Sequence, residues 1–255
     1  MSCFACARDR LAVLLFALVA TLPAQLPAAS LNDTGQTQCF NGTNLVPCTA
    51  ANSGDAATYP RQDGRFGRDA RSGAGQLAKT GGGAGGFDFT PLDNSGTAIG
   101  LDGSGNPLSV PACVRDNVTG LIWEVKTADN GLRDKDYTYT WYDGVGGLSD
   151  GGNNCFTTTR CDTDKYIQDV QAAGLCGYST GWRLPTMHEL VSIVHHERSG
   201  ASIDSSFFPN TVPERFWTSD RAAHMMWAYA WCVHFDHGEN RTCYRGHAYA
   251  VRLVR

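Results

Sequence analysis

The sequence has little charge, and its net charge is not positive. Lys, Arg, Asp and Glu together make up 18% of its 255 residues, and the formal net charge is −4 at pH 7. Proteins that bind nucleic acids without sequence preference present a strongly basic face to the phosphates. The composition therefore argues against nucleic acid as a partner of this chain.

The chain also lacks an apolar run long enough to cross a membrane. The run from Leu11 to Leu22 ends at Pro23 and is shorter than the roughly 20 residues that a spanning helix needs. Arg8 and Arg10 precede it, and the small residues 28–30 follow. This order is typical of a secretory signal peptide. We predict a signal peptide over residues 1–30, no transmembrane anchor, and an exported protein that is periplasmic, secreted or held at the cell surface.

The close Cys-x-x-Cys pairs that zinc and redox sites use are missing from the mature sequence. Cys3 and Cys6 form one such pair, but they lie in the predicted signal peptide and leave with it. Of the ten cysteines, eight then remain. An even set in an exported chain indicates a disulfide framework, with a zinc site as the alternative.

Sequence separation suggests which of these cysteines pair. The two short separations favour the local bridges Cys39–Cys48 and Cys155–Cys161. Cys113–Cys176 follows by elimination. Cys232 and Cys243 remain as either a further disulfide or two unrelated thiols.

Periodic hydrophobicity is scarce between residues 31 and 111. Gly-rich tracts such as 81–86 and 102–107 are typical of turns and extended loops. We therefore expect a Gly-rich, loosely structured N-terminal extension over residues 31–111, pinned by Cys39 and Cys48, and a compact domain over residues 112–255.

Alternating and β-branched residues predict strands in the second region. We expect strands at residues 119–125, 137–142, 216–219 and 231–235, and a closing strand around residues 251–253. A long loop is expected between residues 143 and 162. In residues 231–236, alternation predicts that Trp231, Val233 and Phe235 are buried and that the residues between them, Cys232, His234 and Asp236, are exposed.

Two helices are predicted among these hairpins. Residues 164–173 place Tyr166, Ile167 and Val170 on one side. The second helix begins at Thr186, where Thr186 and Glu189 have the spacing of a capping box. Its apolar stripe consists of Met187, Leu190, Val191 and Val194. We expect His195 and His196 on the exposed side of this helix. Helices among antiparallel hairpins define an α+β domain.

Several motifs, taken in order, resemble the Lcl C-terminal domain family of exported bacterial proteins. They are Asp116–Glu124 (DNVTGLIWE), Trp182–Thr186 (WRLPT) with Glu189-Leu190, Phe216–Ser219 (FWTS), Ala230-Trp231 and the terminal Val251–Arg255 (VRLVR). The resemblance covers roughly Cys113 to Arg255. It implies a C-type-lectin-like fold, similar also to the formylglycine-generating sulfatase-modifying enzymes. It further implies a ligand-binding function, with adhesion to glycans as the best-known example, although a shared fold does not fix a function.

No complete catalytic or zinc-binding motif is visible in the sequence. His188-Glu189 begins like the zinc-protease motif, but Ser192 occupies the position of the second ligand. His234 and His237 could approach one another across a turn, without a full ligand set. A nucleophile elbow and a phosphate loop are also absent. We therefore predict no catalytic residue and no metal ligand, and we favour a binding protein over an enzyme.

Two alternatives remain open at this stage. Loop oxygens that could bind calcium come from Asp129, Asp134, Asp136, Asp143, Asp150, Asn153 and Asn154, but the sugar-binding triplets of C-type lectins are absent. The enzyme alternative is an oxidase similar to formylglycine-generating enzymes that uses Cys232 and Cys243. A purely structural envelope protein is a third reading.

The C-terminal hairpin is the candidate ligand surface. In relatives of this family, diversity-generating retroelements often rewrite the segment before the terminal motif by mutating template adenines, and residues 221–250 fit that pattern. The scaffold would be Trp231, Val233, Phe235 and Gly238. The candidate ligand-binding residues are Cys232, His234, Asp236, His237, Asn240, Arg241, Tyr244, Arg245, His247 and Tyr249. Their partner would be a glycan or a surface protein. An ordinary polar hairpin is the alternative.

Overall fold

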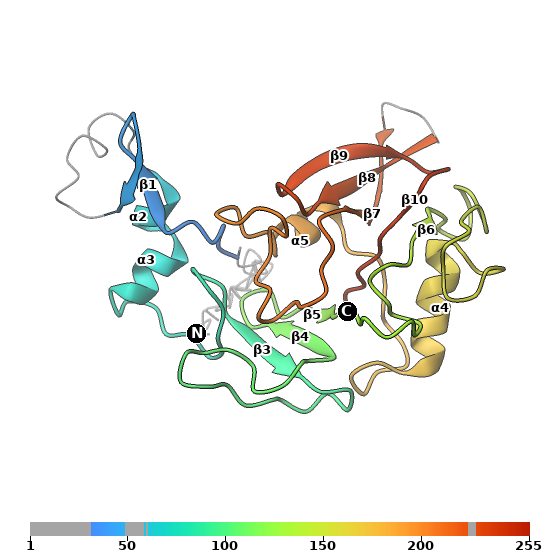
Figure 1. Ribbon diagram of the computed structural model, residues 1–255, viewed down its shortest axis with the longest axis horizontal. Coiled ribbons are helices and arrows are strands. Elements are labelled where there is room, and N and C mark those ends of the chain that lie inside the picture. The colour runs from blue at the N-terminus through green and yellow to red at the C-terminus, as the bar shows by residue number, and fades with distance from the viewer. Residues whose placement is uncertain (1–31, 49–58, 60, 224–227) are drawn as a thin grey trace, which may run out of the picture.

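The computed structural model of the chain describes residues 32–48, 59, 61–223 and 228–255 (Figure 1). The predicted signal peptide, with Cys3 and Cys6, lies outside the described residues. Within the part of the chain that the structure describes, no helix has the length and apolar character required to traverse a bilayer.

The chain folds into small antiparallel sheets with a few helices between them. In chain order the elements are β1 (Gln38–Phe40), β2 (Leu45–Pro47), α2 (Asp63–Phe66), α3 (Arg68–Gly73), β3 (Phe89–Leu92), β4 (Cys113–Asp116), β5 (Ile122–Glu124), β6 (Tyr139–Thr140), α4 (Thr163–Ala173), α5 (Met187–Val191), β7 (Arg215–Arg221), β8 (Tyr229–His234), β9 (Glu239–Tyr244) and β10 (Ala248–Tyr249). The sheets are β1-β2, β3-β4-β5, β7-β8-β9 and β6-β10. The predicted α+β class is confirmed, and α4 and α5 are the two helices described between residues 112 and 255.

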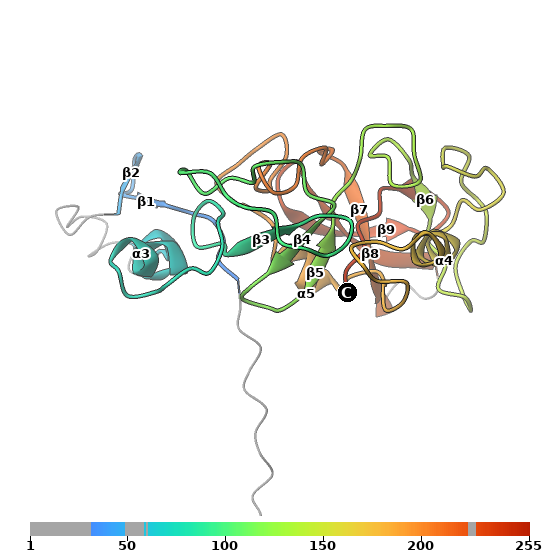
Figure 2. The same ribbon diagram turned by 90° about the horizontal axis from the view of Figure 1, so that it is seen from below.

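The elements spread along one long axis. Helices α2 and α3 lie at one end and α4 at the other, and the two three-stranded sheets lie between them (Figure 2). The three-stranded sheet β3-β4-β5 includes β3, which comes from the region predicted to be an irregular extension. Phe87 and Phe89 from this region are each 1% exposed, and Leu92 pairs with Cys113 of β4.

Glycines of this region serve close packing. A Cβ atom on Gly82 would lie 2.0 Å from the carbonyl oxygen of Gly105, and one on Gly81 would lie 2.0 Å from that of Phe89. Real Cβ atoms do not approach a backbone atom so closely, so only glycine fits at these two positions. The Gly-rich composition predicted a loosely structured region because composition alone does not show which backbone segments pack against one another.

Strand β5 is buried on both faces. Alternation predicts that Leu121, Trp123 and Val125 share one face, and Ile122 and Glu124 on the opposite face are buried as well as Trp123. The C-terminal residues cover this edge: Ile122 and Arg255 exchange backbone hydrogen bonds of 2.9 Å each. The predicted closing strand is therefore an extended segment, bridged to both Trp123 and Arg183 through Val254, and the regular strand β10 precedes it.

A buried charged cluster joins β5 to α4 and the C-terminal segment. The Glu124 carboxylate accepts a hydrogen bond from the Tyr166 hydroxyl, lies 3.2 Å from Lys126 Nζ, and accepts one of 2.9 Å from the Leu253 backbone N–H. Arg252 donates to the Glu124 backbone carbonyl at 3.1 Å. Burial lowers the pKa of Lys126, and it lowers that of Arg252 to about 10. Removing one member of a buried ionic group typically costs about 3–5 kcal/mol.

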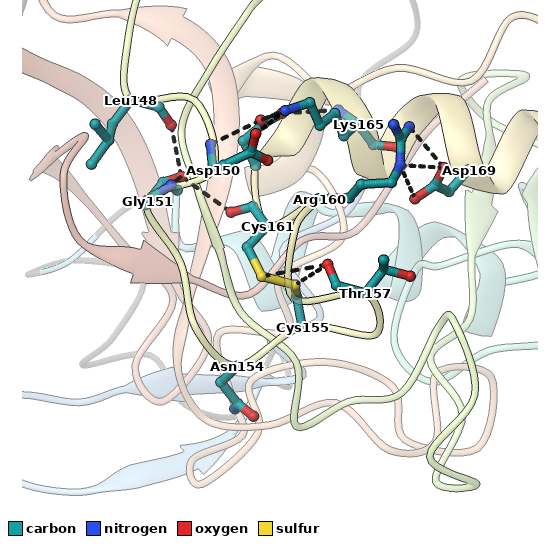
Figure 3. The surroundings of a disulfide bond; sticks show 12 residues. Leu148, Asp150, Gly151, Asn154, Cys155, Thr157, Arg160, Cys161, Lys165 and Asp169 are labelled. Atoms are coloured by element: carbon teal, nitrogen blue, oxygen red, sulfur yellow. Dashed lines mark hydrogen bonds and ion pairs between the residues drawn. A yellow bond between two sulfur atoms is a disulfide. The ribbon is translucent and has the colours of Figure 1, made fainter.

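All three predicted disulfides are present. They are Cys39–Cys48, Cys113–Cys176 and Cys155–Cys161. The third closes a short turn in the long loop between β6 and α4, and two ion pairs attach this loop to the helix, one from Asp150 before the bridge and one from Arg160 within the closed turn (Figure 3). Arg160 pairs with Asp169 at 2.8 Å, and Lys165 pairs with Asp150.

Both predicted helices form, and each has a side-chain cap at its N-terminus. Asp162 caps α4 by accepting a hydrogen bond of 2.9 Å from the Lys165 N–H. The capping box of α5 is complete: Thr186 Oγ1 accepts from the Glu189 N–H at 3.2 Å, and Glu189 Oε2 accepts from the Thr186 N–H at 2.8 Å. Helix α5 ends at Val191, so the predicted apolar stripe continues through Val194 in a turn rather than in the helix.

The turn after α5 anchors the N-terminal segment. His195 was predicted to be exposed and is buried instead, because Gly35 packs against its ring; a Cβ on Gly35 would lie 2.8 Å from that ring. His196 does remain exposed, and its N–H donates to the Thr34 carbonyl at 2.8 Å. Glu197 accepts a hydrogen bond of 2.8 Å from the Thr37 hydroxyl. The two parts of the chain are thus joined directly.

The capping box yields a first prediction. Replacing Thr186 with Ala removes the oxygen that accepts the Glu189 N–H, so we expect a loss of about 1 kcal/mol in the free energy of unfolding. Denaturant titration of the oxidised protein measures it. Thr158→Ala, at an exposed loop position, is the matched control. Equal stability of the two variants would contradict the assigned role of Thr186.

The burial of His195 yields a second prediction. Burial lowers the pKa of His195 below its ordinary value of about 6.5. As the pH falls, the imidazole is therefore protonated in the unfolded chain before it is protonated in the folded chain. The stabilisation by neutral His195 is complete above pH 6.5 and is lost as the pH falls towards the folded-state pKa. We expect His195→Leu to lose less unfolding free energy than the natural chain between pH 7.5 and 5.5. An identical loss in both proteins would exclude this contribution.

Candidate functional site

The predicted ligand residues lie at the two ends of the β8–β9 hairpin. One group surrounds the turn and consists of His234, Asp236, His237, Asn240 and Arg241. The other lies at the opposite end and consists of Tyr244, Arg245, His247 and Tyr249. A strand rises about 3.3 Å per residue, so the ends of the six-residue strands lie about 17 Å apart, and Arg241 and Tyr244 are about 10 Å apart along β9. The hairpin thus presents two surfaces rather than one.

At the turn end, neighbouring side chains satisfy one another. His237 Nε2 lies 2.9 Å from Asp236 Oδ2, and Arg241 lies 2.6 Å from Glu239. The Asp236 N–H donates to His234 Nδ1 at 3.2 Å. Asn240 turns towards α5, where its amide lies 3.2 Å from the Met187 sulfur. This end has few groups left over for a ligand.

The centre of the hairpin is scaffold. Alternation predicted that Cys232 is exposed, but it is 0% exposed and bonded to Cys243. The prediction is wrong because both faces of β8 are covered: Ala230 and Cys232 pack into one apolar cluster and Val233 and Phe235 into the other. Trp231, expected to be buried, is half-exposed. Cys232 is therefore unavailable to a ligand.

At the far end, four rings form a continuous aromatic row. The ring centroids of Tyr229 and Tyr244 are 5.7 Å apart, those of Tyr244 and His247 are 5.3 Å apart, and those of His247 and Tyr249 are 6.1 Å apart. Trp217 supports the row from below, 4.9 Å from Tyr249. Tyr244 is 46% exposed. The structure thus gathers three predicted residues and adds Tyr229, which sequence reasoning missed.

Arg245 lies beside the aromatic row and is nearly buried. Its guanidinium stacks on Trp141, 4.2 Å from the ring centroid, and its Nε donates to the Tyr229 carbonyl at 3.1 Å. Burial, and secondarily the nearby Arg221, lowers the pKa of Arg245, while Asp143 opposes the shift. Asp143 forms an ion pair with Arg221. Trp141 was predicted only as part of an aromatic strand, since no sequence signal connects it to a hairpin a hundred residues later.

A hollow of about 200 Å³ opens at Arg245. It is lined by Gly147, Leu148, Ala228, Tyr244, Arg245 and Gly246. Its wall from the β6–α4 loop is fixed, because the Thr140 hydroxyl donates to the Leu148 carbonyl at 2.7 Å and accepts from the Gly151 N–H at 3.2 Å. Figure 3 shows Leu148 and Gly151 on the same loop as the Cys155–Cys161 bridge. The hydrogen bonds of Thr140 therefore hold the loop side of the hollow in place.

A larger hollow of about 420 Å³ lies on α4 and the start of α5. Ile167, Leu184 and Trp141 supply its apolar lining. Its charged neighbours already have partners: Arg183 forms a double hydrogen bond with Glu189, and Asp143 pairs with Arg221. This hollow is large, but the charged groups around it are already paired and leave few polar groups for a ligand.

The residues considered as metal ligands do not come together. Asp134 accepts the Asp129 and Asn130 N–H groups at 2.8 and 2.6 Å, and Asp150 pairs with Lys165. Across residues 32–48, 59, 61–223 and 228–255, the one group of three His, Cys, Asp or Glu side chains close enough to share an ion is Asp33, Asp63 and Asp69. It contains neither the predicted calcium residues nor His234 and His237.

These features define a disulfide-stapled α+β domain with an aromatic and cationic patch beside its C-terminal hairpin. The chain belongs to the Lcl C-terminal domain family, whose profile matches residues 112–255. This range agrees with the span over which the sequence motifs resemble that family. No curated protein matches the chain.

The cysteine pairing gives a third prediction. Four bonds engage all eight cysteines outside the predicted signal peptide. The mature protein, denatured without reductant, should therefore show no free thiol on titration. A mechanism of the formylglycine-generating kind needs the Cys232 and Cys243 sulfurs as thiols. Two titratable thiols per chain, mapped to these positions, would refute the pairing and favour the oxidase alternative.

Proposed function

We propose that this protein is an exported ligand-binding or adhesion module with a C-type-lectin-like fold. Its binding surface is the aromatic row of Tyr229, Tyr244, His247 and Tyr249 together with the hollow at Arg245. Family membership and the four disulfides support a binding module that works outside the cytoplasm.

The observation that carries this proposal is the composition of the far hairpin end. Tyrosine and arginine are the residue types that dominate binding energy at interfaces, since they combine a large contact area with hydrogen-bonding groups. Here they stand on strands braced by a buried disulfide and by Trp217. A rigid base under exposed rings reduces the entropy lost when a ligand binds.

The retroelement hypothesis fits this surface with one change. The buried Cys232–Cys243 bond assigns both cysteines to the scaffold rather than to the varied set. Tyr244 and His247 are exposed positions where variation would alter what is bound with little effect on either apolar cluster, whereas Arg245 stacks on Trp141 of the first cluster. Residues 224–227, inside the same segment, lie outside the described residues.

A fourth prediction tests the surface directly. The mature protein should bind a subset of a glycan and surface-protein array, and the double variant Tyr244→Ala, His247→Ala should lose that binding. A hot-spot loss of about 2 kcal/mol corresponds to a roughly thirtyfold weaker Kd.

The matched control is the double variant His237→Ala, Arg241→Ala at the turn end of the same hairpin. It alters the same number of exposed side chains, with Arg241 about 10 Å from Tyr244 along β9 and His237 beyond it in the turn, and it should bind as the natural chain does. If the control variant loses the ligand and the Tyr244 variant keeps it, the surface is at the other end. Absence of binding to every array element would oppose a binding function.

A further inference from the structure

Two arginines converge on one point with a single carboxylate between them. A Cβ atom on Gly146 would lie 3.8 Å from Arg221 Nη2 and 3.9 Å from Arg245 Nη1. Both guanidinium groups also lie over Trp141, at 5.9 and 4.2 Å from its ring centroid. Asp143 hydrogen-bonds to Arg221 through Nε at 2.9 Å. One positive charge is therefore left in excess.

The unpaired charge belongs to the buried partner. Arg245 is 3% exposed, and within the described part of the chain its Nη2 has no hydrogen-bond partner. Burying a charged donor without a partner is costly, and proteins rarely keep such a group without a use. Trp141 covers one face of the guanidinium, Nε is occupied and Nη2 is itself buried, so a ligand would meet Arg245 at Nη1, on the side of the Gly146 position that Arg221 Nη2 also faces.

The geometry suits a carboxylate. Arg245 Nη1 and Arg221 Nη2 both face the Gly146 position, so the two oxygens of one planar carboxylate could each accept a charge-assisted hydrogen bond from one of the two guanidinium groups. One excess positive charge matches one negative charge. Glycine at position 146 leaves the two arginine heads uncovered, because any side chain there would lie against both of them.

The rim of the hollow is apolar. Leu148 is 42% exposed and Tyr244 is 46% exposed, and both line it. Val145, next to Gly146, is 87% exposed. Exposed apolar and aromatic side chains around a desolvated arginine are the arrangement of protein interface hot spots, where an apolar ring keeps water from the central polar contact. This favours a protein ligand over a glycan at this hollow.

We infer that the Arg245 hollow binds a carboxylate of a protein ligand, carried by an acidic side chain or a chain terminus with apolar residues beside it. This inference rests on the proposed binding function and adds the chemistry of the group bound. Arg245 Nη1 and Arg221 supply the donors and the positive charge, and Leu148 and Tyr244 supply the apolar contacts.

The probe is N-acetyl-leucine, which carries one carboxylate beside one apolar side chain, compared with its uncharged amide. Titrated into mature protein with labelled arginine side chains, N-acetyl-leucine should shift the Arg245 Nε–Hε resonance in a saturable manner. The amide should not shift it. A methyl sulfate titration distinguishes a carboxylate site from a general anion site.

Two variants remove the site in different ways. Arg245→Lys keeps the charge and loses the planar guanidinium that stacks on Trp141 and places Nη1, and Gly146→Leu covers both arginines. Gly146 has ordinary backbone angles, and its Cβ contacts are of normal van der Waals length, so Gly146→Leu should fold even if Arg245→Lys does not. Each variant should weaken carboxylate binding at least tenfold, whereas Arg241→Lys should leave it unchanged.

The outcomes separate this inference from the proposed function. Equal binding of the amide, preference for methyl sulfate, or full binding by Gly146→Leu would overturn the carboxylate site. If array ligands still require Tyr244 in that case, the binding function stands alone. If the array shows no ligand while N-acetyl-leucine binds as described, the carboxylate site stands and the broader function fails.

Discussion

The buried carboxylate of Glu124 holds the domain together. It lies on β5, receives the Tyr166 hydroxyl from α4, faces Lys126, and accepts the Leu253 N–H from the C-terminal segment. Three parts of the chain that are distant in sequence therefore meet at one charged group. Such a group fixes one arrangement among the many that apolar contacts alone would allow, because each alternative packing leaves a buried charge without its partners.

This constraint reaches the candidate site through the C-terminal segment. Val254 is bridged to Trp123 and Arg183, and Ala250 is bridged to Phe216 of β7. Strand β7 pairs in turn with β8. The sheet under the aromatic row is thus positioned by the buried charged cluster, while the cluster itself stays away from any surface that a ligand could touch. The residues of the buried charged cluster are separate from those of the proposed binding surface, so Tyr244 and His247 at the exposed hairpin end can change with little effect on that cluster.

Features formed by residues close in the sequence could be predicted, whereas contacts between distant segments could not. The capping box of Thr186 and Glu189 spans three residues, and Cys39–Cys48 and Cys155–Cys161 are neighbours in the chain, so spacing alone identified them. The prediction that Cys232 is exposed was wrong, because alternation assumes a sheet with one solvent-exposed face. Burial of His195 depends on Gly35, and the place of Trp141 in the site depends on Arg245. Neither pairing has a periodicity that a single sequence could reveal.

The Cys232–Cys243 bridge also constrains the order in which the protein matures. Thiol–disulfide exchange requires a thiolate to reach a sulfur atom, and these two residues are 0% and 3% exposed once the sheet is packed. An isomerase can therefore form or correct this bond only while the β8–β9 hairpin is still open. The short separation of 11 residues makes early closure easy, since the entropy cost of closing a loop grows with its length. Oxidation at the hairpin thus precedes final packing, and after packing the proposed binding surface rests on a disulfide that reductants in solution cannot reach.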